Sequence, residues 1–312
     1  MSRCPLLYVE IPDGLQYSRE GLRKLHPKLE QLHDFPLTAE EQLHEAAALA
    51  AKISIQGVQP KLSVRLDAGT GTFRVVETLG QYIVKPPNPA FPQLPENEDL
   101  TMRLASISGI DVPFHGLIYA KDGSMSYLIR RFDRIGRKGK LAAEDFAQLG
   151  GFSRETKYDS SVEQVIRLIE TFTTFPAVEK LKLFARILFC FLTGNEDMHL
   201  KNYSIITSKG GIHRLSPAYD LLNTTIALRT AEEESALPLR GRKRNLTRKD
   251  LVEYLGSERL ELPPQAIDTV LSRFRQAIPE YRRLIEISFL SDDQKRAYTD
   301  LLTRRSLVLG FE

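Results

Sequence analysis

The chain has 312 residues, of which 42% are hydrophobic and 27% charged, and its formal net charge is only +3. This composition is typical of a globular protein, and the near balance of charge argues against a general nucleic-acid coat while allowing a local basic patch. Two cysteines exclude a disulfide framework and a cysteine metal cluster and indicate a reducing compartment. No window resembles a membrane helix of about 18 or more apolar residues, and the N-terminus lacks the apolar core of a secretory signal.

The first half of the chain combines short strand-like runs with two helical patterns. We predict a helix after Thr38, because Thr38 and Glu41 form a capping-box pattern ahead of an apolar face. Five prolines between residues 86 and 95 argue against regular structure there, and a helix is predicted at 96–108. Residues 1–37 give no firm assignment. Alternating or β-branched runs predict antiparallel strands at 59–66, 72–76, 81–85, 112–119 and 126–132.

Helical patterns dominate after Arg134. Apolar residues fill two faces of the pattern at 176–193, so we expect its second half, with Cys190, to be buried nearly all round. A β-hairpin is predicted to join 203–206 to 212–215. Further helices are predicted at about 143–149 and 161–173, with capping-box patterns at Ser161/Gln164, Thr247/Asp250 and Ser291/Gln294.

The order of these elements predicts the fold class. Strands come first along the chain and helices follow, which is typical of an α+β fold rather than of a parallel α/β sheet. We expect two lobes with a cleft between them. The strand-rich lobe should span residues 1–133 and the mostly helical lobe residues 134–312.

The segment Gly194–Asn202 carries the strongest chemical signal. Asp197 and Asn202 stand five residues apart directly after the apolar helix, and Asp220 follows the predicted hairpin. Protein kinases use this Asp-x-x-x-x-Asn spacing in the catalytic loop, where the Asp orients the substrate hydroxyl and the Asn holds a magnesium ion. Any one of these residues is more often a turn former, but the combined pattern favours phosphoryl transfer. Lys201 could neutralise charge that develops on the transferred group.

Weaker signals in the first half complete a phosphoryl-transfer set. Lys85 ends a predicted strand and could reach nucleotide phosphates, although a lone strand-end lysine is more often a surface residue. Glu98 could pair with Lys85, or be a first-turn glutamate favoured by the helix dipole. The loop Ser54–Lys61 could cover phosphates through its backbone amides. It lacks a recognised glycine-rich phosphate motif, so an ordinary helix-to-strand connection is the alternative.

Two further features admit more than one interpretation. His199 has no second histidine or cysteine at zinc-ligand spacing nearby, so a loop-bracing or phosphate-contacting role is favoured over a metal ligand. The basic run Arg240–Arg244 is most often a solvated surface. It could instead contact nucleic acid or an acidic partner.

Taken together, these segments resemble HipA-like kinases, the toxin component of bacterial toxin–antitoxin systems. The matching pieces occur in the family's order between about residues 52 and 225, and such an ordered series is more specific than any single motif. They are Ser54–Lys61, Lys85, Asn97-Glu98, Arg131–Arg134, Glu144–Phe146, Lys157-Tyr158, Gly194–Asn202 and Ala218–Asp220.

The resemblance implies a serine/threonine protein kinase that uses ATP and Mg²⁺. Asp197 would be the catalytic aspartate, assisted by Lys201, and Asn202 and Asp220 would be the metal ligands. Ser54 matches the site at which the family autophosphorylates and inactivates itself. Nucleotide binding is implied for Ile55, Gln56, Gly57, Val58, Gln59, Lys61, Lys85, Glu98, Arg130, Phe132 and His199.

Two departures from the family pattern have consequences. The kinase core begins almost at once, which resembles the short, HipT-type branch, in which a separate small protein resembles the N-terminal domain of longer relatives. Arg130 stands at a nucleotide-hinge position where relatives often carry an acidic residue. A main-chain contact to the nucleotide would survive this change, whereas a carboxylate contact would not.

The resemblance also implies partners and a location. The protein substrate would be a translation component such as an aminoacyl-tRNA synthetase, whose modification halts growth. A helix-turn-helix antitoxin would bind the chain and connect it indirectly to operator DNA, and a small protein like the N-terminal domain could be a third component. We therefore expect a protein of the bacterial cytoplasm with no membrane partner.

Two other functions stay open on the sequence. A small-molecule phosphotransferase shares the Asp-x-x-x-x-Asn logic and the two lobes, although the Ser54 loop and Arg131–Arg134 favour the toxin family. A non-catalytic co-repressor scaffold would make use of the basic run Arg240–Arg244. The presence of every catalytic and metal-binding residue argues against that scaffold.

Overall fold

The structure is a computed structural model of the chain. It describes residues 2–52, 59–136, 139–153, 155–228 and 233–311. The chain forms two compact units, and each is built from discontinuous segments. The N-terminal unit contains residues 1–99, 113–138 and 287–290, and the C-terminal unit contains residues 100–112, 139–286 and 291–312. The lobe boundary at residues 133/134 stays a prediction.

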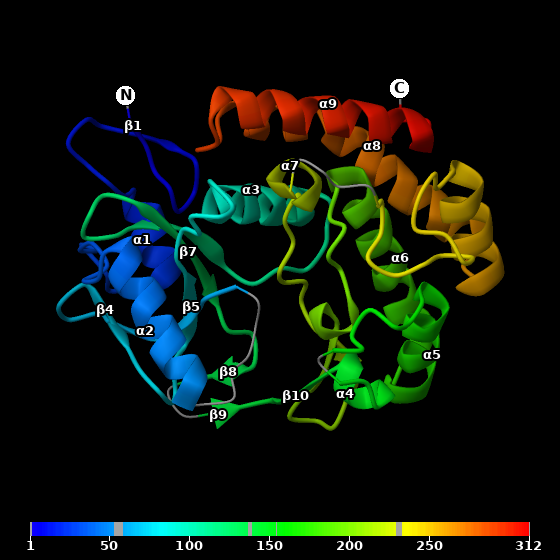
Figure 1. The fold of residues 1–312 in the computed structure, drawn as a ribbon, viewed down its shortest axis with the longest axis horizontal. Helices are drawn as coiled ribbons and strands as arrows, with labels where there is room; N and C mark the ends of the chain where they lie inside the picture. Colours follow the sequence, from blue (N-terminus) through cyan, green and yellow to red (C-terminus); the bar gives the residue numbers. More distant parts are fainter. Residues whose placement is uncertain (1, 53–58, 137–138, 154, 229–232, 312) are drawn as a thin grey trace. The chain divides into compact units, whose positions relative to one another are not determined.

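The N-terminal unit is built on a five-stranded antiparallel sheet in the order β4-β3-β5-β7-β6. The alternation that predicted these strands has a packing cause, because Leu62, Val64 and Val84 point into one hydrophobic cluster and are buried. Helix α2 (Ala39–Lys52) lies against β3 (Figure 1). Its predicted capping box is present between Thr38 and Glu41. The strands are β3 (Leu62–Asp67), β4 (Thr72–Val75), β5 (Tyr82–Lys85), β6 (His115–Tyr119), β7 (Met125–Arg130) and the short β8 (Arg134–Ile135).

The first 37 residues, which gave no prediction, cover this sheet. Strands β1 (Ser2–Arg3) and β2 (Glu10–Ile11) pair with each other, and α1 (Arg19–Leu25) follows. Leu22 and Leu25 of α1 join the hydrophobic cluster of the sheet. A seven-residue helix contains too few turns to show a clear hydrophobic period, which explains why the sequence alone did not reveal it.

Two predicted boundaries are wrong. Helix α3 runs from Leu94 to Ile107 and therefore includes Pro95, which is tolerated because the first turn of a helix does not need its N–H. The stretch predicted as a helix at 143–149 begins instead as strand β10 (Ala142–Asp145), and only Phe146–Gly150 form helix α4. The side chain of Asp145 caps α4 in a capping box with Gln148, so the helix cannot begin earlier.

The C-terminal unit is mostly helical around α6 (Pro176–Thr193), which contacts α5, α9 and η2. From Leu183 to Thr193 every side chain of α6 except that of Ala185 is buried, which confirms the prediction of an all-round buried second half. Figure 1 shows α9 beside α8 within this unit. The other elements are β9 (Gly139–Lys140), α5 (Val162–Phe172), the 3-10 turn η1 (Leu200–Asn202), β11 (Ser204–Thr207), β12 (His213–Leu215), α7 (Thr224–Leu228), the π-helix η2 (Lys249–Arg259), α8 (Pro264–Glu286) and α9 (Asp292–Leu309).

A three-stranded sheet, β10-β11-β12, adjoins these helices and holds the segments on which the chemical signal falls. Strand β10 pairs with β11 so that Asp145 lies opposite Ser204, and β11 and β12 form the predicted hairpin. The segment 194–202 precedes this hairpin and Asp220 follows it. The sheet therefore brings Asp145 close to the C-terminal end of the predicted catalytic segment, where it contacts Lys201.

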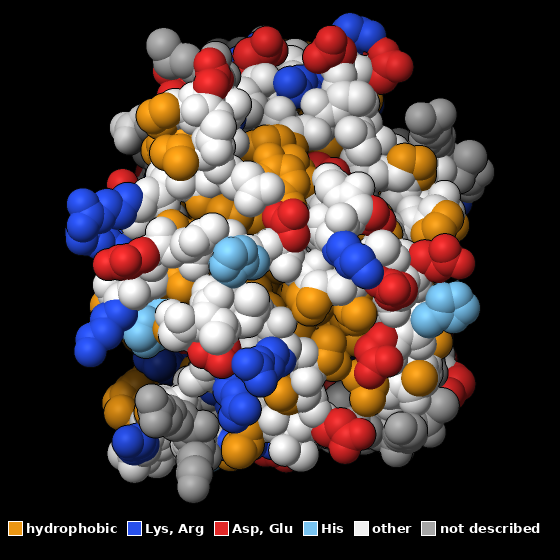
Figure 2. All heavy atoms as spheres, turned by 90° about the vertical axis from the view of Figure 1, so that its left-hand side faces the viewer, with side chains coloured by type: hydrophobic (Ala, Val, Ile, Leu, Met, Phe, Trp, Pro, Cys, Tyr) orange, Lys and Arg blue, Asp and Glu red, His pale blue; other side chains and the backbone are white. Residues whose placement is uncertain are grey.

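The surface carries charges of both signs. Figure 2 shows Lys and Arg side chains interspersed with Asp and Glu on the face that it presents, as the small net charge suggests. Both cysteines are buried free thiols. None of the helices among the described residues combines the length and the apolar character that crossing a bilayer requires.

A glycine ends α6 and turns the chain into the predicted catalytic segment. Gly194 has φ +68°, in the left-handed region, and a Cβ there would clash with Leu301 Cδ2 and lie 2.7 Å from Thr225 Oγ1. We predict that Gly194→Ala lowers the free energy of unfolding by at least about 1–2 kcal/mol, because the backbone is strained and the neighbours leave no room. Denaturant unfolding measures the loss.

The matched control is Gly210→Ala in the β11–β12 turn. A Cβ there meets only Ser208 Oγ at 3.9 Å. We expect this change to leave the free energy of unfolding within about 0.5 kcal/mol of the parent. Equal losses in the two variants would show that the conformation at Gly194 is not special.

Candidate active site

The segment after α6 fixes the main chain of Asp197 from both sides. The Asp197 N–H donates to Asn195 Oδ1 at 3.1 Å, and the Asp197 carbonyl accepts from Asn202 Nδ2 at 2.9 Å and from the His199 N–H at 2.8 Å. Asn195, His199 and Asn202 are all buried. The five-residue spacing thus lets the Asn202 side chain close the loop onto Asp197, whose own side chain stays partly exposed.

The carboxylate of Asp197 already holds a hydroxyl group. The Tyr158 phenol, from the segment between α4 and α5, donates a hydrogen bond to Asp197 Oδ1. Burial raises the pKa of Tyr158, and the hydrogen bond to Asp197 raises it further, so the phenol keeps its proton and donates. Tyr158 belongs to the segments that resemble the family, but no local pattern in the sequence indicates this contact.

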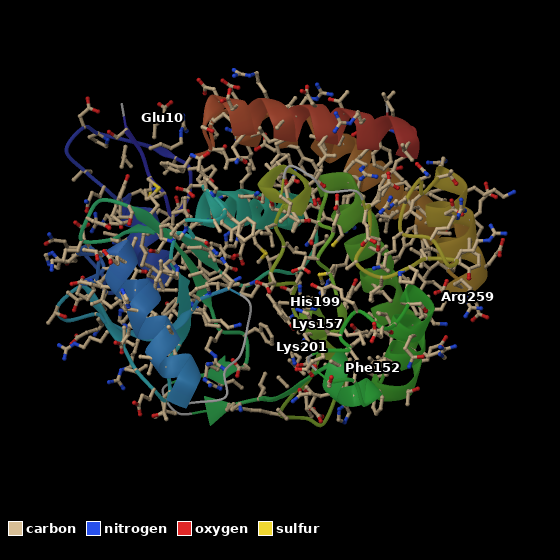
Figure 3. The ribbon with its side chains drawn as sticks, in the orientation of Figure 1. Glu10, Phe152, Lys157, His199, Lys201 and Arg259 are labelled. Carbon is tan, nitrogen blue, oxygen red and sulfur yellow. The ribbon has the colours of Figure 1, made fainter. Side chains whose placement is uncertain are left out.

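His199 ties the same two segments together. Its Nε2 lies 2.8 Å from Lys157 Nζ, and its ring meets the Tyr158 ring edge-on at 5.0 Å. Burial lowers the pKa of His199 and Lys157 adds to this, whereas the carboxylates of Asp197 and Asp220 oppose it. Both carboxylates therefore lie within electrostatic reach of one imidazole. Figure 3 shows His199, Lys157 and Lys201 grouped together, and these contacts are those of a loop brace.

Lys201 has a carboxylate partner that the sequence did not reveal. Its Nζ lies 2.8 Å from Asp145 Oδ2, and both side chains are partly buried. Asp145 also caps α4 through its other oxygen, which accepts from the Gln148 N–H at 2.9 Å. One carboxylate thus caps a helix and holds the lysine of the predicted catalytic segment.

The segment before Asp220 is anchored to the predicted catalytic segment through Tyr219. The Tyr219 hydroxyl donates to the Lys201 carbonyl at 3.0 Å and lies 2.6 Å from Ser204 Oγ. On the opposite side, the buried Arg186 of α6 donates to the Ser216 carbonyl at 2.8 Å. Asp220 itself has φ +59°, a left-handed conformation that non-glycine residues adopt rarely and that Asp tolerates better than most.

Asn202 and Asp220 supply donors that fit Mg²⁺. Asn202 donates through Nδ2, so Oδ1 is the atom left to accept, and Asp220 contributes a carboxylate. Mg²⁺ prefers oxygen ligands, uses one or two carboxylates, and takes water and substrate phosphate for the rest. Within the described ranges no group of three or more His, Cys, Asp or Glu residues could hold a metal ion. Water and phosphate would therefore have to complete the coordination.

Lys85 and Glu98 form a buried ion pair in the N-terminal unit. Lys85 Nζ lies 2.6 and 2.9 Å from the two Glu98 oxygens, with side-chain exposures of 7% and 0%. Strand β5 ends at Lys85, and α3 presents Glu98 from its second turn. A bidentate carboxylate fixes where the ammonium group lies.

The remaining predicted nucleotide contacts are only partly described. Arg130 donates to the Leu25 carbonyl and to the Tyr82 hydroxyl, both at 3.0 Å, so its guanidinium is held by α1 and β5. Arg131 and Arg134 both pair with Asp133, and Phe132 is half-buried beside them. Gln59 and Lys61 precede β3. Ser54, Ile55, Gln56, Gly57 and Val58 lie outside the described residues.

The basic run 240–244 faces carboxylates of its own unit. Arg242 pairs with Asp250, and Arg240 lies 4.0 Å from the same carboxylate. Lys243 Nζ lies 3.3 Å from Glu233. Because these cations already have anionic neighbours, the run is less positive as a surface than its sequence suggests.

The Lys85–Glu98 pair generates a stability prediction. Glu98→Gln removes the charge of the carboxylate that pairs with the buried Lys85 ammonium, so we expect a loss of about 3–5 kcal/mol in the free energy of unfolding. The double variant Lys85→Met/Glu98→Leu removes both charges and should recover most of that loss. Chemical denaturation of the three proteins measures this. A single variant as stable as the parent would contradict the burial and pairing described.

A comparison with protein families matches most of the chain. Residues 53–281 match the family model of the HipA-like C-terminal domain. A protein of Haemophilus influenzae with the provisional name kinase is 30% identical over 220 residues, which cover 67% of this chain and 64% of that protein. The provisionally named kinase Y4dM of Sinorhizobium fredii is 32% identical over 281 residues, or 85% and 66% of the two chains. The serine/threonine-protein kinase toxin HipA of Shewanella oneidensis is 26% identical, over 83% of this chain and 65% of that protein.

The chain thus spans just under two thirds of the length of these curated relatives. Among solved structures, Shewanella oneidensis HipA, in complex with HipB and operator DNA, superposes with a TM-score of 0.69 at 24% identity. That superposition covers 91% of this chain and 74% of HipA. The Helicobacter pylori proinflammatory kinase CtkA gives a TM-score of 0.54 at 18% identity, covering 74% and 86%. These likenesses show that the fold is the α+β fold of HipA and CtkA. From the family model and the relatives together, the chain belongs to the HipA-like C-terminal domain family.

Proposed function

We propose that this chain is an ATP-dependent serine/threonine protein kinase. The observation that supports it best is the hydroxyl group held by the carboxylate of Asp197, on a loop closed by the Asn202 amide. A kinase needs a carboxylate that accepts a substrate hydroxyl, next to oxygen donors for metal. Membership of the HipA-like family, with relatives named as kinases, supports the same activity.

We assign one role in phosphoryl transfer to each residue of the candidate site. Asp197 orients the acceptor hydroxyl and accepts its proton, while Lys201, held by Asp145, offsets negative charge on the transferred phosphoryl group. Lys85, fixed by Glu98, contacts the α- and β-phosphates of ATP. Asn202 and Asp220 would hold Mg²⁺, which neutralises phosphate charge when bound. His199 braces the loop through Lys157.

We further propose that the kinase is the toxin of a toxin–antitoxin system. The name of the Shewanella relative and the composition of its solved complex with HipB and operator DNA support this. The partner would be a helix-turn-helix antitoxin that connects the chain to DNA, and the target a translation component such as an aminoacyl-tRNA synthetase. Phosphorylation of Ser54 would add negative charge beside the phosphate site and weaken ATP binding.

The described contacts bear on one of the two rival functions. A co-repressor scaffold that binds DNA directly would use the basic run 240–244, but its cations face Asp250 and Glu233. A small-molecule phosphotransferase would place its acceptor on the same carboxylate. Assays with protein and with metabolite acceptors separate that rival from a protein kinase.

Asp197→Asn tests the catalytic assignment. The amide keeps the size of the side chain but cannot take the acceptor proton, so we expect phosphoryl transfer to fall by about 10²–10⁴-fold. Transfer from ³²P-labelled ATP to protein acceptors and to the chain itself measures this. The melting temperature should stay close to that of the parent. A variant that still transfers phosphate at the parent rate would remove Asp197 from the reaction.

Two substitutions of Asp145 distinguish its contribution to stability from its contribution to catalysis. Asp145→Asn keeps an N-cap of equal quality but loses the charge that holds Lys201, so kcat should fall with little change in stability. Asp145→Ala should reduce kcat similarly and also cost about 1 kcal/mol of stability through the lost cap. Kinetics and unfolding of both variants measure the two effects. If kcat falls only with the alanine variant, Asp145 acts through the helix rather than through Lys201.

A further inference from the structure

An open hollow of about 480 Å³ lies on the C-terminal unit beside Tyr158. It is formed by the segment between α4 and α5, by the first turns of α5, and by residues near the basic run. Phe152, near the start of this segment, is labelled in Figure 3 and lines the hollow together with Tyr158. The side chains that matter to its chemistry are Phe152, Tyr158, Ser160, Gln164, Arg167 and Lys243.

Within the described residues, the Arg167 cation of the hollow has no carboxylate partner. Arg167 is exposed, and it donates to the Gln164 amide oxygen through Nε at 2.9 Å and through Nη2 at 2.5 Å. Lys243 also lines the hollow, but its charge is balanced by Glu233 at 3.3 Å. Asp159, also exposed, is the one acidic residue that lines the hollow among those described. The charge of Arg167 therefore favours an anionic occupant.

Ser160 also lines the hollow, but its hydroxyl does not face the open space. Ser160 Oγ is shielded from solvent. The group that a bound carboxylate would contact is therefore the Arg167 guanidinium, which forms charge-assisted hydrogen bonds with carboxylates.

The hollow and the catalytic carboxylate share one side chain. Tyr158 lines the hollow and at the same time donates its hydroxyl to Asp197. A hydroxyl group can therefore reach Asp197 from the direction of the hollow. An acceptor serine or threonine that takes the place of the phenol would leave its flanking residues in or beside the hollow.

We propose that this hollow is the substrate subsite for an acidic side chain close to the phosphoacceptor residue, and that the Tyr158 phenol holds the position of the acceptor hydroxyl until substrate displaces it. The proposal rests on the kinase function proposed above and specifies its substrate class. The Tyr158 side chain spans the gap between the hollow and Asp197. Because extended chain advances about 3.3–3.6 Å per residue, a substrate that spans the same gap would carry the acidic residue about two to three positions from the acceptor. Arg167 binds its carboxylate.

A peptide library tests the subsite with the full chain. The library carries one Ser or Thr among neutral residues, with Asp, Glu, Lys or phosphoserine fixed in turn at each flanking position, and phosphate incorporation is measured. We expect kcat/KM to be about tenfold higher for Asp or Glu at one position within three residues of the acceptor. Incorporation without any positional preference overturns the subsite but leaves the kinase intact. Absence of transfer to every peptide and protein contradicts the kinase proposal itself.

Substitutions of Arg167 test whether this residue causes the preference for Asp or Glu. Arg167→Ala should abolish the preference for Asp or Glu, and Arg167→Glu should reverse it toward Lys at the same position. Arg259→Ala is the matched control, because Arg259 is an exposed arginine on η2 that does not line the hollow (Figure 3). The Arg259→Ala variant should show the same preference for Asp or Glu as the parent. A preference unchanged by Arg167→Glu, or one confined to phosphoserine, overturns the assignment of a carboxylate to this hollow.

Tyr158→Phe tests the displaced phenol. The variant keeps the ring against His199 but gives Asp197 no hydroxyl, so a substrate has nothing to displace. We expect KM for the best acidic peptide to fall severalfold, with the thermal stability nearly unchanged. A KM equal to or above the parent value would mean that the phenol does not occupy the acceptor position.

Discussion

The hydrogen bonds that hold the main chain of Asp197 are the constraint on which the rest of the site depends. Buried amide side chains from Asn195 and Asn202 bind its N–H and its carbonyl. Because these bonds lie in a shielded environment, they hold the backbone firmly while leaving the carboxylate oxygens to other partners. The same arrangement turns the Asn202 oxygen away from Asp197. One short loop thus separates a hydroxyl-binding carboxylate from an oxygen suited to metal.

The helical scaffold explains why this loop stays in place. Helix α6 is buried over its second half, ends at Gly194 in a left-handed turn, and starts the loop at a defined point. Thr224 and Thr225 donate to the Gly194 carbonyl at 3.1 Å, so the loop start is also held from α7. Arg186, inside the same helix, binds the Ser216 carbonyl before Asp220. A single buried helix therefore positions both the predicted catalytic segment and the segment that ends at Asp220.

Local patterns predicted most elements and failed where contacts are distant. The strands of the N-terminal sheet were predicted because buried and exposed side chains alternate along them, as at Leu62 and Val64. Strand β10 was missed because residues 142–144 are exposed and their pairing partner lies about 60 positions away, which no local period records. In the candidate site, the five-residue spacing of Asp197 and Asn202 could be recognised from the sequence alone. The contacts of Tyr158 with Asp197 and of Asp145 with Lys201 span 39 and 56 positions and depend on the fold.

The most direct test of this account is a crystal structure of the chain with Mg²⁺ and a non-hydrolysable ATP analogue. The account predicts a Mg²⁺ ion bound by Asn202 Oδ1 and by the Asp220 carboxylate, together with phosphate oxygens. It predicts that Asp197 stays outside the metal shell and faces a hydroxyl group. A structure in which the metal lies away from Asn202 and Asp220, or in which Asp197 is itself buried against the protein with no access for a hydroxyl, would contradict it.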